Sequence, residues 1–146
     1  MIVIASDHAG VDLKARILEV VRDGGREIRD LGPADSISVD YPDFGHKVAA
    51  AVIGGEAETG ILICGTGIGM SMTANRHPGI RAALCHDAFT AEMARRHNDA
   101  NVLCMGARVI GAGVAEQAVR VFLSTRFEGG RHQRRVDLIE FNREVS

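Results

Sequence analysis

Short apolar runs alternate with longer amphipathic stretches along the whole chain. The runs are rich in β-branched residues, as is typical of buried strands, and each stretch between them is long enough for one helix. The predicted strands cover residues 2–5, 27–30, 61–64, 81–85 and 102–105. The predicted helices cover residues 11–22, 42–53, 68–75, 87–97, 112–124 and about 131–145.

Regular alternation of strands and helices predicts an α/β fold, in which right-handed crossovers make all strands of the sheet parallel. We expect a Rossmann-like three-layer αβα sandwich with five parallel strands in the order 2-1-3-4-5, plus a C-terminal helix. The 146 residues have the length of one domain, so we expect residues 1–146 to form a single unit.

Composition and charge narrow the class of protein. The chain is 46% hydrophobic and 25% charged, and its net charge of −2 argues against a general nucleic-acid surface. It shows three cysteines without a CxxC pair, no signal peptide and no apolar run of membrane-spanning length. These features predict a cytoplasmic protein that works in a reducing compartment and binds no membrane.

The predicted strand at residues 61–64 ends in a glycine-rich loop, Cys64-Gly65-Thr66-Gly67-Ile68-Gly69. Glycines let the backbone approach a ligand closely, and the unpaired N–H groups that follow suit an anion, a developing oxyanion or a thiolate. In the expected strand order the switch point lies between strands 1 and 3. The loop Ser6-Asp7-His8, which follows strand 1, would therefore share one crevice with Cys64.

These residues also suggest several other kinds of site. Met70 stands where a dinucleotide fingerprint needs its third glycine, and no G-K-[ST] motif of a P-loop is present, but a purely structural turn stays open. Cys85 and Cys104 are predicted to be small buried hydrophobes. The cysteines and histidines lack the paired spacing of a zinc site, so no metal site is predicted.

Two charged motifs each allow a structural or a chemical role. Asp7-His8 is either a helix-capping turn or an acid and an imidazole for ring opening and proton transfer. Arg131 and Arg135 lie at positions i and i+4, on one helix face, and could hold a phosphate by charge-assisted hydrogen bonds. The alternative for these arginines is a solvated basic turn.

Five fragments in order resemble the ribose-5-phosphate isomerase B family, and together they span nearly the whole chain. They are Ser6-Asp7-His8-Ala9-Gly10, Asp40-Tyr41-Pro42, Cys64-Gly65-Thr66-Gly67-Ile68-Gly69, His97-Asn98-Asp99-Ala100-Asn101 and Glu128-Gly129-Gly130-Arg131-His132. The resemblance implies an aldose–ketose isomerase without metal or organic cofactor, acting in the pentose phosphate pathway. Such an enzyme converts ribose 5-phosphate to ribulose 5-phosphate through an enediolate.

The resemblance also implies a role for each matching residue. Cys64 would be the catalytic base, and Thr66 and His97 would assist ring opening. The loop amides of Gly65, Gly67 and Gly69 would hold the enediolate oxygen; Asp7, His8, Tyr41 and Asn98 would bind the sugar; Arg108, Arg131 and Arg135, with His8, would hold the phosphate. Met70 occupies the position where another branch of the family has a glutamate base. Allose, galactose and four-carbon sugar phosphates stay open as substrates.

The predicted position of His97 favours a homodimer with shared active sites, alone or as a dimer of dimers. His97 precedes strand 5, so it lies near the amino end of the sheet, roughly 15 Å from Cys64 at the carboxyl end of strand 3. His97 of one subunit could reach Cys64 of the other. The alternatives are a long excursion of residues 98–101, or no catalytic role for His97.

Two other classes of protein compete with an isomerase. A non-catalytic nucleotide-binding module would use the glycine loop but would not need Cys64, His97 and the arginines together. A thiol-based redox enzyme would need a resolving cysteine near Cys64, and the sequence has none there.

Overall fold

The computed structural model describes residues 1–140, and its five strands form one parallel sheet. The strands are β1 (Ile2–Ser6), β2 (Ile28–Asp30), β3 (Thr59–Cys64), β4 (Ala82–Leu84) and β5 (Val102–Gly106). The helices are a short 3₁₀ turn η1 (His8–Gly10), α1 (Val11–Asp23), α2 (Tyr41–Ile53), α3 (Ile68–Ala74), α4 (Ala88–Asn98), α5 (Ala112–Ser124) and α6 (Arg131–Asp137). The predicted α/β class is confirmed.

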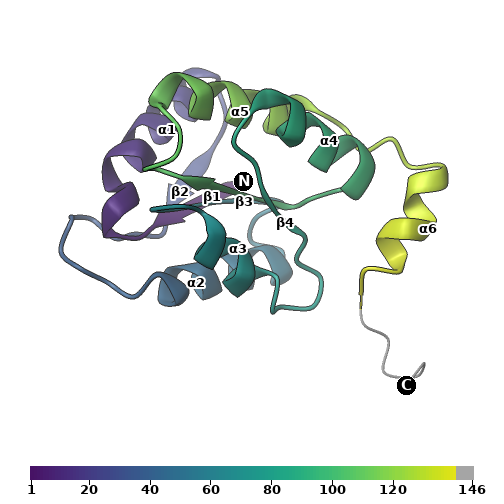
Figure 1. Ribbon diagram of the computed structural model, residues 1–146, viewed down its shortest axis with the longest axis horizontal. Helices are drawn as coiled ribbons and strands as arrows, with labels where there is room; N and C mark the ends of the chain where they lie inside the picture. Colours follow the sequence, from purple (N-terminus) through teal and green to yellow (C-terminus); the bar gives the residue numbers. More distant parts are fainter. Residues whose placement is uncertain (141–146) are drawn as a thin grey trace.

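Helices cover both faces of the sheet, with α1, α4 and α5 on one side and α2 and α3 on the other (Figure 1). Successive residues of a strand point to opposite faces, which divides the core into two clusters. Ile61 and Ile63 of β3 pack toward α1, α4 and α5, whereas Leu62 and Cys64 pack toward α2 and α3. The side chain of Cys64 therefore points to the face of the sheet that α2 and α3 cover.

The observed strand order is β2-β1-β3-β5-β4, which corrects the predicted order 2-1-3-4-5 at one edge. All five residues of β5 are buried, so this strand lies inside the sheet and pairs with β3 and β4. β4 has only three residues, all at least partly exposed, as is typical of an edge strand. The switch point between β1 and β3 is unaffected by this exchange.

The predicted elements differ from the observed ones mainly at the C-terminus. All five strands and five of the helices agree with the prediction within about two residues at each end. The predicted helix 131–145 ends much earlier, because α6 stops at Asp137 and turns follow; its last part, residues 141–146, lies outside the described residues. Within residues 1–140, no helix is long and apolar enough to cross a membrane.

Gly60→Ala tests how closely α2 packs on β3. A Cβ atom at Gly60 would overlap Val48 Cγ1 and lie 3.3 Å from Val102 Cγ2, and both valines are fully buried. We expect the free energy of unfolding to fall by about 1–3 kcal/mol, the usual cost of overpacking a core, as measured by urea denaturation.

The matched control is Gly113→Ala in α5, where an added Cβ meets no atom within 4 Å. It should leave stability unchanged or raise it by up to about 1 kcal/mol through better helix propensity. Equal effects of the two substitutions would show that the contact between α2 and β3 is not tight.

Candidate active site

Three loops meet at the carboxyl edge of the sheet, after β1, β3 and β5. Backbone hydrogen bonds hold them together: Asp7 N–H donates to the Ile63 carbonyl at 3.0 Å, and Ala107 N–H donates to the Cys64 carbonyl at 2.9 Å. Arg108 N–H extends this pattern by donating to the Gly65 carbonyl at 3.0 Å. The three loops at the predicted switch point therefore lie in fixed relative positions.

The Cys64 thiol lies inside the glycine loop. Its Sγ accepts a hydrogen bond from the Gly67 N–H at 3.1 Å, and the residue is only 4% exposed. Gly67 has φ +78°, and a Cβ there would overlap Leu84 Cδ1 and the Met105 backbone. Glycine is therefore required for this turn, which brings an N–H donor to the sulfur, a partner well suited to a thiolate.

The other two cysteines behave as the predicted buried hydrophobes. All three cysteines are free. Burial raises the pKa of Cys85 to about 11, and complete burial raises the pKa of Cys104 further, because both thiolates would lack water. Neither Cys85 nor Cys104 is therefore suited to act as a base near neutral pH.

Asp7 and His8 both hold backbone groups. Asp7 Oδ1 accepts hydrogen bonds from Ala9 N–H at 2.9 Å and Gly10 N–H at 3.2 Å, so the capping role that the sequence left open is present. His8 Nδ1 accepts from Val39 N–H at 3.2 Å. A neutral His8 ring must then carry its proton on Nε2, which makes this nitrogen a donor for an anionic ligand.

Tyr41 and Arg108 border the glycine loop on two sides. A Cβ at Gly69 would lie 2.6 Å from two atoms of the Tyr41 ring, and a Cβ at Gly65 would lie 3.3 Å from Arg108 Nη1. The exposed Thr66 has its Oγ1 within the loop, accepting from Ile68 N–H at 3.3 Å. Arg108 thus lies beside the Cys64 loop of its own chain.

His97 and Asn98 lie at the other end of the sheet. They close α4, and Asn101, which follows, accepts a hydrogen bond from Gly60 N–H at 2.9 Å, at the beginning of β3. Gly60 and Cys64 are four positions apart along β3, or about 13 Å at 3.3 Å per residue. The structure therefore does not bring His97 and Asn98 to Cys64 within one chain.

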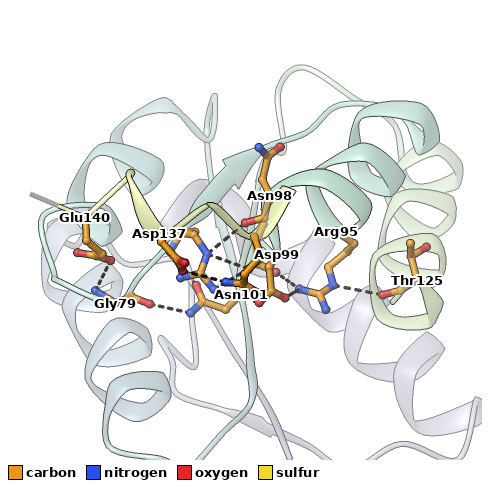
Figure 2. Close-up of polar contacts among 11 residues, drawn as sticks. Gly79, Arg95, Asn98, Asp99, Asn101, Thr125, Asp137 and Glu140 are labelled. Atoms are coloured by element: carbon orange, nitrogen blue, oxygen red, sulfur yellow. Dashed lines mark hydrogen bonds and ion pairs between the residues drawn. The ribbon is translucent and has the colours of Figure 1, made fainter. Parts of the chain in front are cut away.

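The turn after α4 is fixed by a network that the sequence did not predict (Figure 2). Asp99 adopts φ +46°, its carbonyl accepts from Arg81 at 2.9 and 3.0 Å, and its Oδ1 accepts from Arg95 at 3.0 Å. Asn101 joins the network by donating to the Gly79 carbonyl at 2.9 Å. Figure 2 shows the Asn98 amide pointing away from these contacts, so the network aims the side chain outward.

α6 lies beside the end of α4 and brings a second histidine to His97 (Figure 1). The rings of His97 and His132 stack, with centroids 4.3 Å apart and planes 13° from parallel. Burial, helped by the neighbouring His97 and Arg131, lowers the pKa of His132. No role for His132 was predicted from the sequence, although it belongs to the last of the five family fragments.

Glu128 lies against both rings. Its Oε2 lies 4.0 Å from His97 Nε2 and its Oε1 lies 3.8 Å from His132 Nε2, while Arg96 Nε approaches Oε2 at 3.3 Å. In the part of the chain that the structure describes, neither Arg131 nor Arg135 of α6 forms an ion pair. These two arginines therefore present positive charge to solvent or to a partner.

Among residues 1–140, His97, Glu128 and His132 are the one group whose geometry could hold a metal ion, with ligand atoms within 4.8 Å of one another. Imidazoles and a carboxylate are ligands that zinc accepts. A metal ion in the plane of one stacked ring would, however, lie out of the plane of the other, and Arg96 already contacts the carboxylate. The group fits a metal ion poorly.

Comparison with known proteins shows to which protein family the chain belongs. The family model described as Ribose/Galactose Isomerase matches residues 2–139. The chain belongs to the ribose/galactose isomerase family, as its sequence fragments predicted.

Individual relatives match over nearly their full length. Ribose-5-phosphate isomerase B of Escherichia coli is 46% identical over 138 residues, which cover 94% of this chain and 93% of the relative. A putative sugar phosphate isomerase of Bacillus subtilis is 51% identical over 139 residues, covering 94% of this chain and 93% of the relative. The structure of Clostridium thermocellum ribose-5-phosphate isomerase B superposes with a TM-score of 0.93 at 51% identity, covering 94% of this chain and 93% of that one.

Proposed function

We propose that this protein interconverts ribose 5-phosphate and ribulose 5-phosphate, as a cytoplasmic enzyme of the pentose phosphate pathway that needs no metal or organic cofactor. The proposal rests on the position of Cys64. Its sulfur accepts a hydrogen bond from the Gly67 N–H inside a glycine loop at the switch point of the sheet. The Escherichia coli and Clostridium thermocellum relatives, which match along nearly the whole chain, bear the name of this activity.

The proposed reaction moves one proton between two carbons of the open sugar. The Cys64 thiolate takes the proton from C2, the electron pair forms the C1–C2 double bond, and the C1 carbonyl oxygen takes the negative charge of an enediolate. A proton then passes from O2 to O1, and the thiol returns its proton to C1 as the C2 carbonyl forms. Backbone N–H groups of residues 65–69 stabilise the negative oxygen of this intermediate. Because Gly65 and Gly69 have no side chains, Arg108 and Tyr41 can lie against that backbone, where they would border the substrate.

We extend the proposal to a homodimer in which each site uses both subunits. Cys64 and His97 lie at opposite ends of the sheet, so one substrate can meet both only if His97 comes from a second copy. Exposed apolar side chains beside the Cys64 loop, Ile68, Met72 and Leu84, suit such a subunit contact. In this arrangement α6 would bring Arg131 and Arg135 to the phosphate of a substrate bound at the partner's thiol.

Cys64→Ala tests the base. We expect the wild-type enzyme to isomerise ribose 5-phosphate in the presence of a chelator, and Cys64→Ala to lose proton exchange at C2 while it still binds inorganic phosphate, because a base acts mainly in the transition state. Deuterium exchange followed by NMR measures the first and calorimetry the second.

Cys85→Ser and Cys104→Ser are the matched controls, since both thiols are buried in the core. These substitutions should lower the unfolding temperature and have little effect on turnover. A panel of four-, five- and six-carbon sugar phosphates tests the substrate. Absence of turnover on every member, or an absolute need for metal, would refute the proposed activity.

Arg131→Ala and Arg135→Ala test the phosphate clamp. Each variant loses charge-assisted hydrogen bonds worth about 1.5–3 kcal/mol, so KM for ribose 5-phosphate should rise roughly 10- to 150-fold, with a much smaller change in kcat. Steady-state kinetics and inhibition by inorganic phosphate measure the effect. Arg134→Ala, on the same helix, is the control; unchanged phosphate inhibition in both test variants would make the two arginines a solvated surface.

Co-refolding of inactive Cys64→Ala and His97→Ala chains tests the shared site. In a heterodimer both lesions fall in one pocket and the other pocket is intact, so random pairing should restore about a quarter of wild-type activity. Native mass spectrometry of isotope-labelled chains shows whether heterodimers have formed. Heterodimers without activity would place Cys64 and His97 in the same chain's site.

A further inference from the structure

We infer that His132 and Glu128 are positioning residues for His97: His132 fixes the plane of the His97 ring, and Glu128 holds a negative charge against it. The inference rests on the proposed function, in which His97 assists opening of the sugar ring. It assigns a purpose to a cluster built from α4, α6 and the loop between α5 and α6, which the rest of the reaction does not use.

Stacking against His132 restricts the orientation of His97. His132 is only 8% exposed, and its backbone N–H donates to the Gly129 carbonyl at 3.0 Å, so its ring is a fixed platform. The His97 side chain is 39% exposed and closes a helix, where a ring would otherwise rotate about two side-chain bonds. Near-parallel stacking at 4.3 Å limits this rotation and leaves one edge of the ring accessible.

Glu128 is itself held by α4. Its backbone N–H donates to the Arg96 carbonyl at 3.1 Å, and Arg96 Nε contacts its Oε2 at 3.3 Å. The carboxylate oxygens lie 4.0 and 3.8 Å from the Nε2 atoms of His97 and His132, beyond direct hydrogen bonds, so the carboxylate acts through its charge.

The surrounding charges make this carboxylate necessary. Arg96 on α4 and Arg131 and Arg135 on α6 are all positive and would oppose any further positive charge at His97. Sugar-ring opening moves one proton from the C1 hydroxyl to the ring oxygen O4 while the C1–O4 bond breaks and the C1 carbonyl forms. If His97 carries that proton, it is briefly an imidazolium, which Glu128 stabilises before the proton passes to O4.

Two reactions of the same enzyme separate ring opening from proton transfer at carbon. Conversion of ribose 5-phosphate requires both steps, because this aldose is mainly a closed ring. Deuterium uptake from D₂O at C1 of ribulose 5-phosphate requires only the enediolate step, because this ketose has its O5 esterified and stays open. NMR measures the rate of uptake, and a coupled assay measures isomerisation.

In Glu128→Gln and His132→Ala we expect kcat on ribose 5-phosphate to fall by about 10- to 100-fold, at the lower end of the contribution of general acid–base catalysis. C1 deuterium uptake should stay at the wild-type rate, whereas a general structural defect would slow both reactions. His132→Phe keeps an aromatic platform and should recover much of the turnover that His132→Ala loses. Glu92→Gln is the matched control, since it removes another carboxylate that contacts Arg96, at 3.1 Å, and should change neither rate.

A double variant shows whether Glu128 acts through His97. If it does, Glu128→Gln should have no further effect in a His97→Ala chain, whereas independent roles would make the two losses multiply. Equal losses in both reactions, or multiplying losses, would overturn the inference. So would turnover that a chelator abolishes and zinc restores, because the cluster would then be a metal site.

The same measurements separate this inference from the proposed function. If His97→Ala slows ribose 5-phosphate turnover and C1 uptake equally, the ring-opening role of His97 in the proposed function is wrong. If His97→Ala slows only the ring-dependent reaction while Glu128→Gln and His132→Ala slow neither, the positioning inference alone is wrong.

Discussion

The pairing of β3 with β1 on one side and β5 on the other is the constraint on which the candidate site depends. It brings three loops to one edge of the sheet and fixes them by backbone hydrogen bonds, so the position of the Cys64 sulfur does not depend on any flexible side chain. Close packing then forces glycine at Gly67 and Gly106, where a Cβ would overlap neighbouring backbone atoms. A rigid loop of this kind is what preorganised stabilisation of an oxyanion requires.

The same strand separates the remaining site residues from the thiol. A rigid strand cannot bend to bring its two ends together, and about 13 Å of β3 separates Gly60 from Cys64, so His97 and Asn98 stay at the opposite end of the sheet from the thiol. The network around Asp99 holds the turn after α4 rigidly, which excludes the long excursion of residues 98–101 considered from the sequence. Either the site combines residues of two chains, or His97 has no role in the chemistry.

The sequence predicted those features that depend on local pattern. Alternating apolar runs predicted the α/β class, and the apolar run before a glycine loop predicted Cys64 at the end of a buried strand. The position of β5 inside the sheet depends on contacts between distant segments, although its fully apolar composition was a usable signal beside the short β4. The contacts of Glu128 and His132 with His97 could not be predicted, because 31 residues or more separate them in the chain and only the docking of α6 on α4 joins them.

Cys64 lies in a buried strand and His97 lies on the protein surface, and this difference suits the different parts that they play in the proposed reaction. Abstraction of a proton from carbon needs close control of the distance between base and carbon, and Cys64 is buried in the central strand. Proton transfer between oxygen atoms tolerates a side chain at the surface, provided that its orientation and charge are controlled, and His97 has a stacked ring and a carboxylate for this purpose. A lesion in the cluster around His97 can therefore slow ring opening without disturbing the sheet edge that holds the thiol.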